Sequence, residues 1–113
     1  MTMEADLTTM LKTICPRVTP DIAKTSTTRP YVTYQQIGGE VINPLNNDAP
    51  GKRNAVLQIN VWSDLRSEAI ALMDQIEDAM RAFRAARPRS ARFNDYDPDM
   101  LVYGSQQEFS FWY

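Results

Sequence analysis

"NAVLQINVWSDLRSEAIALMDQIEDAMRAF" spans Asn54 to Phe83 and decides the fold class. In its first ten residues Leu57, Ile59 and Val61 alternate with other side chains, and this period of two predicts a half-buried β-strand. In the remainder, apolar residues return every three or four positions, which predicts an amphipathic helix of about five turns. The apolar face of this helix is expected to comprise Leu65, Ala69, Leu72, Ile76, Met80 and Phe83.

The two ends of this helix carry signals of their own. Ser63 or Asp64 is expected to cap the first turn, and Pro88 must end the helix at the latest because proline cannot continue it. Glu77 and Arg81 lie four residues apart, a spacing that predicts an ion pair worth about a few tenths of a kcal/mol.

The segments before this stretch predict a second helix and a second strand. A stripe of apolar side chains predicts a helix over Met3–Ile14, and Pro16 is expected to stop it. A short extended piece is expected at Arg17–Thr19. "YVTYQQIG", Tyr31–Gly38, is rich in β-branched and aromatic residues and predicts a strand. The residues of the helical stripe are Met3, Leu7, Met10, Leu11 and Ile14.

A long connection, Gly38–Asn54, separates the two predicted strands, which most simply pair as an antiparallel hairpin. It has neither a helical nor a strand period, whereas ordinary connections run about 4–6 residues. One interpretation is a hairpin arm that orders on contact with another chain, with Val41, Ile42 and Leu45 as its anchors. The other is a tolerated insertion, because long loops cost little closure entropy.

The C-terminal segment predicts a last strand from about Leu101 to Trp112, and Phe93 is expected in a short strand of its own. On the last strand Phe109 and Phe111 face the core, while Ser110 and Trp112 face the other way. A central strand explains this pattern by itself. Alternatively, Trp112 and Tyr113 also cover a neighbouring subunit, since Trp and Tyr are enriched at interface hot spots.

These elements predict one α+β domain over residues 1–113, with two layers. An antiparallel sheet carries two helices on one face, and a long hairpin loop joins two of its strands. The net charge of −2 gives no overall attraction to nucleic acid or to an anionic membrane. No apolar stretch approaches the ~20 residues that span a bilayer, and the N-terminus lacks the pattern of a secretory signal. The single cysteine, Cys15, is expected to pack at the helix end.

The residue types argue against a catalytic or metal site. The chain has no histidine, which excludes Ser-His and Cys-His nucleophiles and histidine zinc sites. Asp95, Asp97 and Asp99 alternate as at the start of a calcium loop, but Met100 and Gln106 stand where that loop needs glycine and glutamate. An Asp-rich turn is the preferred interpretation. We therefore expect a protein that is not an enzyme and that binds no metal or cofactor.

A run of arginines ends the second helix and follows it. One interpretation is a basic patch that touches phosphate or an acidic partner, and it makes a small nucleic-acid-binding module the alternative function. The other is a solvated helix end whose arginines pair with Asp95 and Asp97. The five residues are Arg81, Arg84, Arg87, Arg89 and Arg92.

The order and spacing of four segments resemble a family of small tail-completion proteins of long-tailed bacteriophages and prophages, similar in role to the tail terminator. The segments are "LKTICPRVTPDIA", "RPYVTYQQIGGE", "QINVWSDLRSEAIALMDQIEDAM" and "YDPDMLVYGSQQEFSFWY". The resemblance implies a homo-oligomeric ring, typically a hexamer, at the head-proximal end of the tail tube. There it would stop tube polymerisation and dock to the head.

The resemblance also implies the partners and the location. The partners would be further copies of the chain, the tail tube protein and the head–tail connector protein, with DNA in the channel as a further candidate. The protein would be assembled in the bacterial host cytoplasm and end in the virion tail, with no membrane contact. The family offers no catalytic residues or cofactors to carry over.

Overall fold

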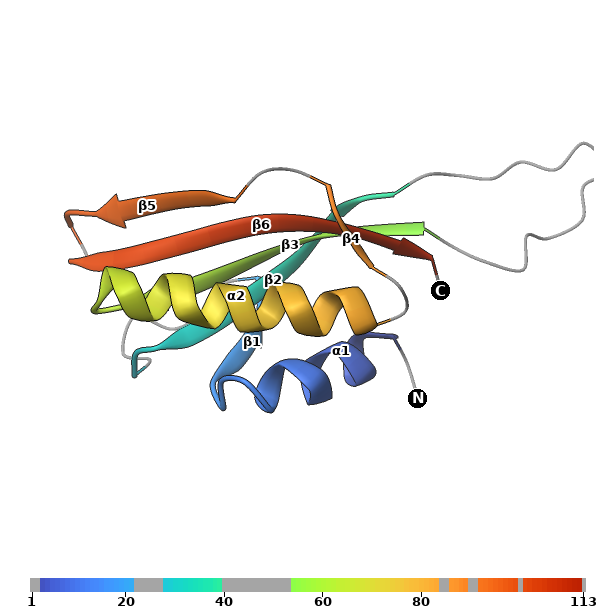
Figure 1. Ribbon diagram of the computed structural model, residues 1–113, viewed down its shortest axis with the longest axis horizontal. Helices are drawn as coiled ribbons and strands as arrows, with labels where there is room; N and C mark the ends of the chain where they lie inside the picture. The colour runs from blue at the N-terminus through green and yellow to red at the C-terminus, as the bar shows by residue number, and fades with distance from the viewer. Residues whose placement is uncertain are drawn as a thin grey trace, which may run out of the picture.

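The computed structural model describes residues 3–21, 28–39, 54–83, 86–89, 92–99 and 101–112. Its elements form two layers, with both helices on the same side of one sheet (Figure 1). This arrangement confirms the predicted α+β fold. The elements are α1 (Met3–Lys12), β1 (Val18–Pro20), β2 (Tyr31–Gly38), β3 (Asn54–Ser63), α2 (Arg66–Ala82), β4 (Arg87–Pro88), β5 (Phe93–Asp97) and β6 (Val102–Trp112).

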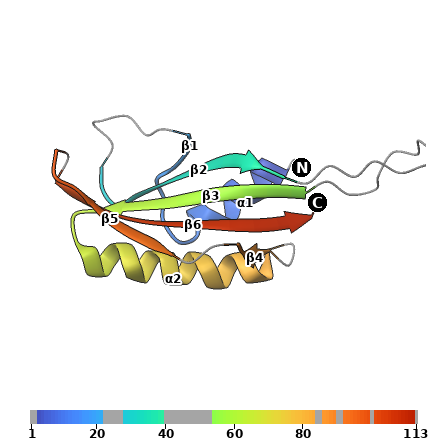
Figure 2. The ribbon, with the colours of Figure 1, turned by 90° about the horizontal axis from the view of Figure 1, so that it is seen from above.

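The sheet has the strand order β1-β2-β3-β6-β4, and β5 also pairs with β6. All pairs are antiparallel, as predicted, except β1 and β2, which run parallel at one edge of the sheet. The long strands β3 and β6 form the centre and pair from Asn54 opposite Trp112 to Ser63 opposite Tyr103. Seen from above, β2, β3 and β6 lie side by side, and α2 runs along β6 (Figure 2).

The strands of the predicted hairpin occur with the predicted bounds, Tyr31–Gly38 and Asn54–Ser63, and they are antiparallel neighbours. Their connection lies outside the described residues, and so do the three predicted anchors of the arm, Val41, Ile42 and Leu45. The short strand predicted around Phe93 is present as β5.

The helix bounds differ from the prediction at the end of α1 and at the start of α2. The helix α1 ends at Lys12 rather than Ile14, because the backbone there tightens into a turn in which Ile14 N donates to Leu11 O. The helix α2 begins at Arg66, after the expected caps, and it ends at Ala82, well before Pro88. The short extended piece is displaced by one residue, to Val18–Pro20.

The start of α2 corrects both the predicted cap and the predicted face. Leu65 occupies the N-cap in extended backbone without a side-chain cap, and it is 60% exposed. Ser63 Oγ instead accepts a hydrogen bond from Leu65 N at 3.2 Å and donates to Glu68. Because the helical backbone begins only after Leu65, the Leu65 side chain lies outside the buried apolar stripe of the helix. Met73, which was not predicted there, is part of that stripe. The buried residues of α2 are Ala69, Met73, Ile76 and Met80.

The core lies between the helices and one face of the sheet. Alternate residues of β3, which include Leu57, Ile59 and Val61, are buried, as are Phe109 and Phe111 of β6. This confirms that the two phenylalanines face the core. Each such side chain contributes about 1.5–3 kcal/mol on burial. The other core members include Leu7 and Leu11 of α1, Val32 and Tyr34 of β2, and Cys15, which packs after α1 as predicted.

Candidate interaction surfaces

The face of the sheet away from the helices is lined in its middle by amide and hydroxyl side chains, with Val56 and Val102 buried toward its two ends. We call it the open face, and it follows from strand alternation, since neighbours across a ladder point to the same side. Across this face Gln58 Nε2 donates to Gln106 Oε1 at 3.4 Å, and Asn60 Nδ2 donates to Thr33 Oγ1 at 3.3 Å. The middle of the open face is therefore polar, with its side chains bonded to each other across the strands.

At one end of the open face, an aromatic ring lies directly on a glycine. Trp62 of β3 stands opposite Gly104 of β6, and a Cβ atom added at Gly104 would lie 2.6 Å from Trp62 Cζ3. The indole ring thus rests directly on the glycine backbone. Only glycine permits this approach without moving the ring.

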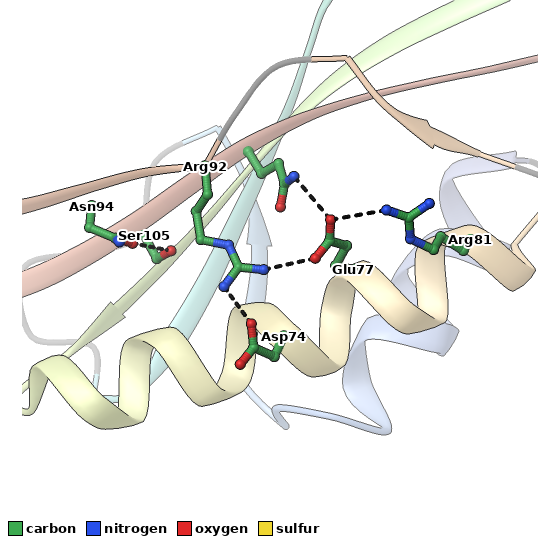
Figure 3. Close-up of polar contacts among 7 residues, drawn as sticks. Asp74, Glu77, Arg81, Arg92, Asn94 and Ser105 are labelled. Atoms are coloured by element: carbon green, nitrogen blue, oxygen red, sulfur yellow. Dashed lines mark hydrogen bonds and ion pairs between the residues drawn. The ribbon is translucent and has the colours of Figure 1, made fainter.

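The predicted arginine cluster divides between the two sides of the sheet. Arg92 lies on the helix side, where it donates to Asp74 Oδ1 and, at 3.0 Å, to Glu77 Oε2 of α2. The predicted pair between Glu77 and Arg81 is present at 3.3 Å (Figure 3). Gln107 Nε2 also donates to Glu77 Oε1, at 3.3 Å. These contacts join β6 and the segment before β5 to the middle of α2.

The partners of Arg92 differ from those that the sequence suggested. Pairs with Asp95 and Asp97 were expected, but these two residues alternate onto the open face, opposite Gly104 and Val102. Arg92 points to the other side of the sheet. A separation of three or five residues in the sequence therefore did not bring the charges together.

Two further arginines belong to the open face. Arg87 stands opposite Ser110, and Arg89 N donates to Glu108 O at 2.8 Å, which continues the same ladder. The Arg89 guanidinium lies 4.0 Å from the Glu108 carboxylate. Arg84 lies outside the described residues. The structure therefore brings Arg81 and Arg92 together on one side, and Arg87 and Arg89 together on the other.

Two unlike apolar surfaces occupy opposite ends of β6. At the end where the chain turns from β5 into β6 lies the surface that we call the hairpin-end surface, which consists of Leu65, Tyr96 and Leu101. It borders a groove of about 230 Å³ between α2 and β5. The loop-end surface consists of Ile37 and Trp112, at the ends of β2 and β6. Trp112 points away from the core, as predicted, and is 38% exposed, whereas Tyr113 lies outside the described residues.

The two aspartates of β5 accept hydrogen bonds from nearby backbone. Asp95 Oδ1 accepts from Tyr96 N at 2.8 Å, and Asp97 Oδ1 accepts from Asp99 N at 3.0 Å, as Asp does in turns. Across the described part of the chain, His, Cys, Asp and Glu side chains nowhere gather in the groups of three or more that could hold a metal ion. Neither described helix has the length and apolar character needed to cross a bilayer.

Fold and surfaces together define a small two-layer α+β domain whose distinctive features are a polar open face and two apolar ends. The chain belongs to the family of tail completion protein gp17, whose family model matches residues 2–113. No curated protein matches the chain. Membership confirms the resemblance read from the four segments. It makes the protein a structural component of phage tail assembly, which implies contacts with other tail components.

Proposed function

We propose that the protein forms a homo-oligomeric ring of six subunits at the head-proximal end of the tail tube. There the ring stops tube polymerisation and docks to the head–tail connector protein. Family membership supports a role in completing the tail. The observation that carries the ring is the pair of unlike apolar surfaces at opposite ends of β6.

A cyclic ring joins two different patches of neighbouring subunits, repeated around the axis. The hairpin-end surface of one subunit would receive the loop-end surface of the next. Trp112 is the natural anchor, since tryptophan is enriched among residues that dominate binding energy. The groove beside Tyr96 offers it a concave surface with Ala69, Ile70 and Tyr103 in its lining, next to the polar Arg66, Asn94 and Asp95.

The arm between β2 and β3 adds to this proposal through the sequence alone. Because β2 and β3 are neighbours, the arm starts and ends at the same end of the sheet as Trp112. Val41, Ile42, Leu45 and Tyr113 would then contact the same neighbouring subunit or the tail tube. Contact with DNA in the channel is not included, because Asp74 and Glu77 neutralise the arginines on the helix side.

The ring is tested by native mass from light scattering over a concentration series, with and without purified tail tubes, followed by negative-stain imaging. We expect a closed ring of about six subunits that is lost in Trp112→Ala, because the variant removes the anchor. Gln35→Ala, an exposed change on the open face, is the matched control and should still form rings. A monomer under every condition, tail tubes included, would overturn the proposal.

Deletion of Val41–Lys52 tests the arm separately. We expect the shortened chain to keep its circular dichroism spectrum but to assemble no longer, since the strands that flank the arm pair along their own length. A deletion variant that forms normal rings would remove the arm from the interface.

The alternative function, a small nucleic-acid-binding module, is tested by DNA titration at several salt concentrations. Arg87→Ala with Arg89→Ala should weaken salt-sensitive DNA binding, and absence of binding at low salt would exclude that function.

A further inference from the structure

One edge of the sheet carries a row of charged and aromatic side chains that belong to neither of the two apolar surfaces. The strands β4 and β5 follow one another along β6, and within the described residues neither has a second strand beside it. Edge strands present unpaired backbone groups and are natural sites for pairing with another chain. We define the edge row as Arg87, Arg89, Phe93, Asp95 and Asp97.

The register along β6 places the members of the edge row at regular steps. They lie opposite Ser110, Glu108, Gln106, Gly104 and Val102 in that order, at every second residue of β6. Positions two apart on a strand point to one face and lie about 6.8 Å apart. All five side chains therefore project on the open face, in a line about 27 Å long.

The positions in the edge row are symmetric about Phe93, and the charges on its two sides are opposite. Two arginines stand on one side of Phe93 and two aspartates stand on the other, at matching steps along β6. A two-fold rotation about Phe93 brings Arg87 of one copy to Asp97 of the other, and Arg89 to Asp95. It also brings Phe93 onto Phe93. A parallel arrangement in the same register would instead place like charges opposite each other, which destabilises a sheet pair.

The centre of the row is suited to contact. Phe93 is 57% exposed, and Arg87 and Asp95 are exposed beside it. The Glu108 carboxylate lies 4.0 Å from Arg89, but a guanidinium has five donors and can serve two carboxylates. A pair of aromatic rings at the centre is favourable beyond the area that it buries, in an offset or edge-to-face arrangement.

We propose that the free subunit forms a two-fold dimer through the edge row, centred on Phe93. The partner is a second copy of this chain, because the charge pattern matches its own two-fold image. A single cyclic ring contains no such two-fold axis, so this contact is distinct from the ring interface at the two ends of β6. The dimer belongs to the subunit before it joins the tail.

A disulfide trap tests the position of the axis. The variant Phe93→Cys places a thiol on the axis, and the native Cys15 is buried and does not compete. We expect mild oxidation to convert the variant almost completely into a covalent dimer. Gln75→Cys, exposed on α2 and outside both the row and the two apolar surfaces, is the matched control and should stay mostly uncrosslinked. Equal crosslinking in both variants, or none in Phe93→Cys, would overturn the proposal.

Charge reversal tests the pairing itself, in a Trp112→Ala background so that the ring contact does not contribute. Arg87→Glu with Arg89→Glu gives a row that is acidic on both sides, and Asp95→Arg with Asp97→Arg gives one that is basic on both sides. We expect each double variant alone to sediment as a monomer of 12.9 kDa. An equimolar mixture should form a 1:1 dimer of twice that mass.

The outcomes separate this proposal from the ring. Dimerisation of either double variant alone, or a mixture that stays monomeric, would overturn the edge contact whatever the ring does. Loss of rings in Trp112→Ala with an intact Phe93→Cys crosslink would support both proposals as independent contacts. Added salt should weaken the unmodified dimer, since salt screens the attraction between exposed charges. The Debye length is about 8 Å at physiological ionic strength and becomes shorter as salt is added.

Discussion

The two faces of the sheet are built by the same strands and have opposite character. On the helix side, Ala55 and Leu57 of β3 lie opposite the buried Phe111 and Phe109 of β6. On the open face, Gln58 and Asn60 of the same strand carry hydrogen-bonded polar groups. The difference shows that the two sets of alternate positions in each long strand serve different purposes. Alternate positions determine the fold, and the positions between them determine what the folded subunit can contact.

The largest expected effect separates the two faces directly. Phe109→Ala should lower the free energy of unfolding by about 3–5 kcal/mol, because it leaves a cavity among fully buried side chains. Gln106→Ala on the open face should change it by no more than about 0.5 kcal/mol. Urea unfolding followed by circular dichroism measures both. Equal losses in the two variants would mean that the open face is packed as tightly as the core.

A smaller effect is expected where the open face is closely packed. Gly104→Ala should cost about 1–3 kcal/mol, since the new Cβ would lie 2.6 Å from the Trp62 ring. Gly38→Ala is the matched control, because its Cβ would meet nothing within 4 Å. Thermal unfolding of both variants, and of Gly104→Ala combined with Trp62→Leu, checks the cause. A double variant no more stable than Gly104→Ala would exclude the ring contact as the origin.

The smallest effect of the series concerns the charges that link α2 to the sheet. Arg92→Met keeps the alkyl stem but removes the donors to Asp74 and Glu77, and should cost about 1–2 kcal/mol, between exposed and buried ion pairs. Arg81→Met, which removes a more exposed pair, should cost no more than about 0.5 kcal/mol. The difference between the variants should shrink in about 1 M salt. An unchanged difference would assign the loss to packing.

The sequence predicted those parts of the fold that depend on local period. The strands Tyr31–Gly38 and Asn54–Ser63 were predicted with their bounds, because alternation and flanking breakers are local signals. The assignment of Leu65 to the core failed, because helical phase begins only at the next residue. The strand β4 was not predicted, since two residues carry no period and pair only through the register of β6.

The candidate surfaces were harder to predict than the fold, for a similar reason. Trp112 was correctly placed on the outer face by alternation within one strand. The edge row was missed, because Arg87 and Asp97 become comparable only through their shared partner strand β6. Sequence alone grouped Asp97 with a calcium loop and Arg87 with an arginine run. The strand register across two segments was the information that the sequence pattern lacked.

The placement of the two tryptophans has a practical consequence for spectroscopy. Trp62 rests on Gly104 at the junction of β3 and β6, while Trp112 is 38% exposed at the loop end. In Trp112→Phe, tryptophan fluorescence would report only whether the pairing of β3 and β6 around Gly104 is intact. In Trp62→Phe, the emission would come only from the end of β6, and a blue shift during assembly would record the moment that this end leaves water. One chain thus carries separate built-in reporters for its folding and for its association.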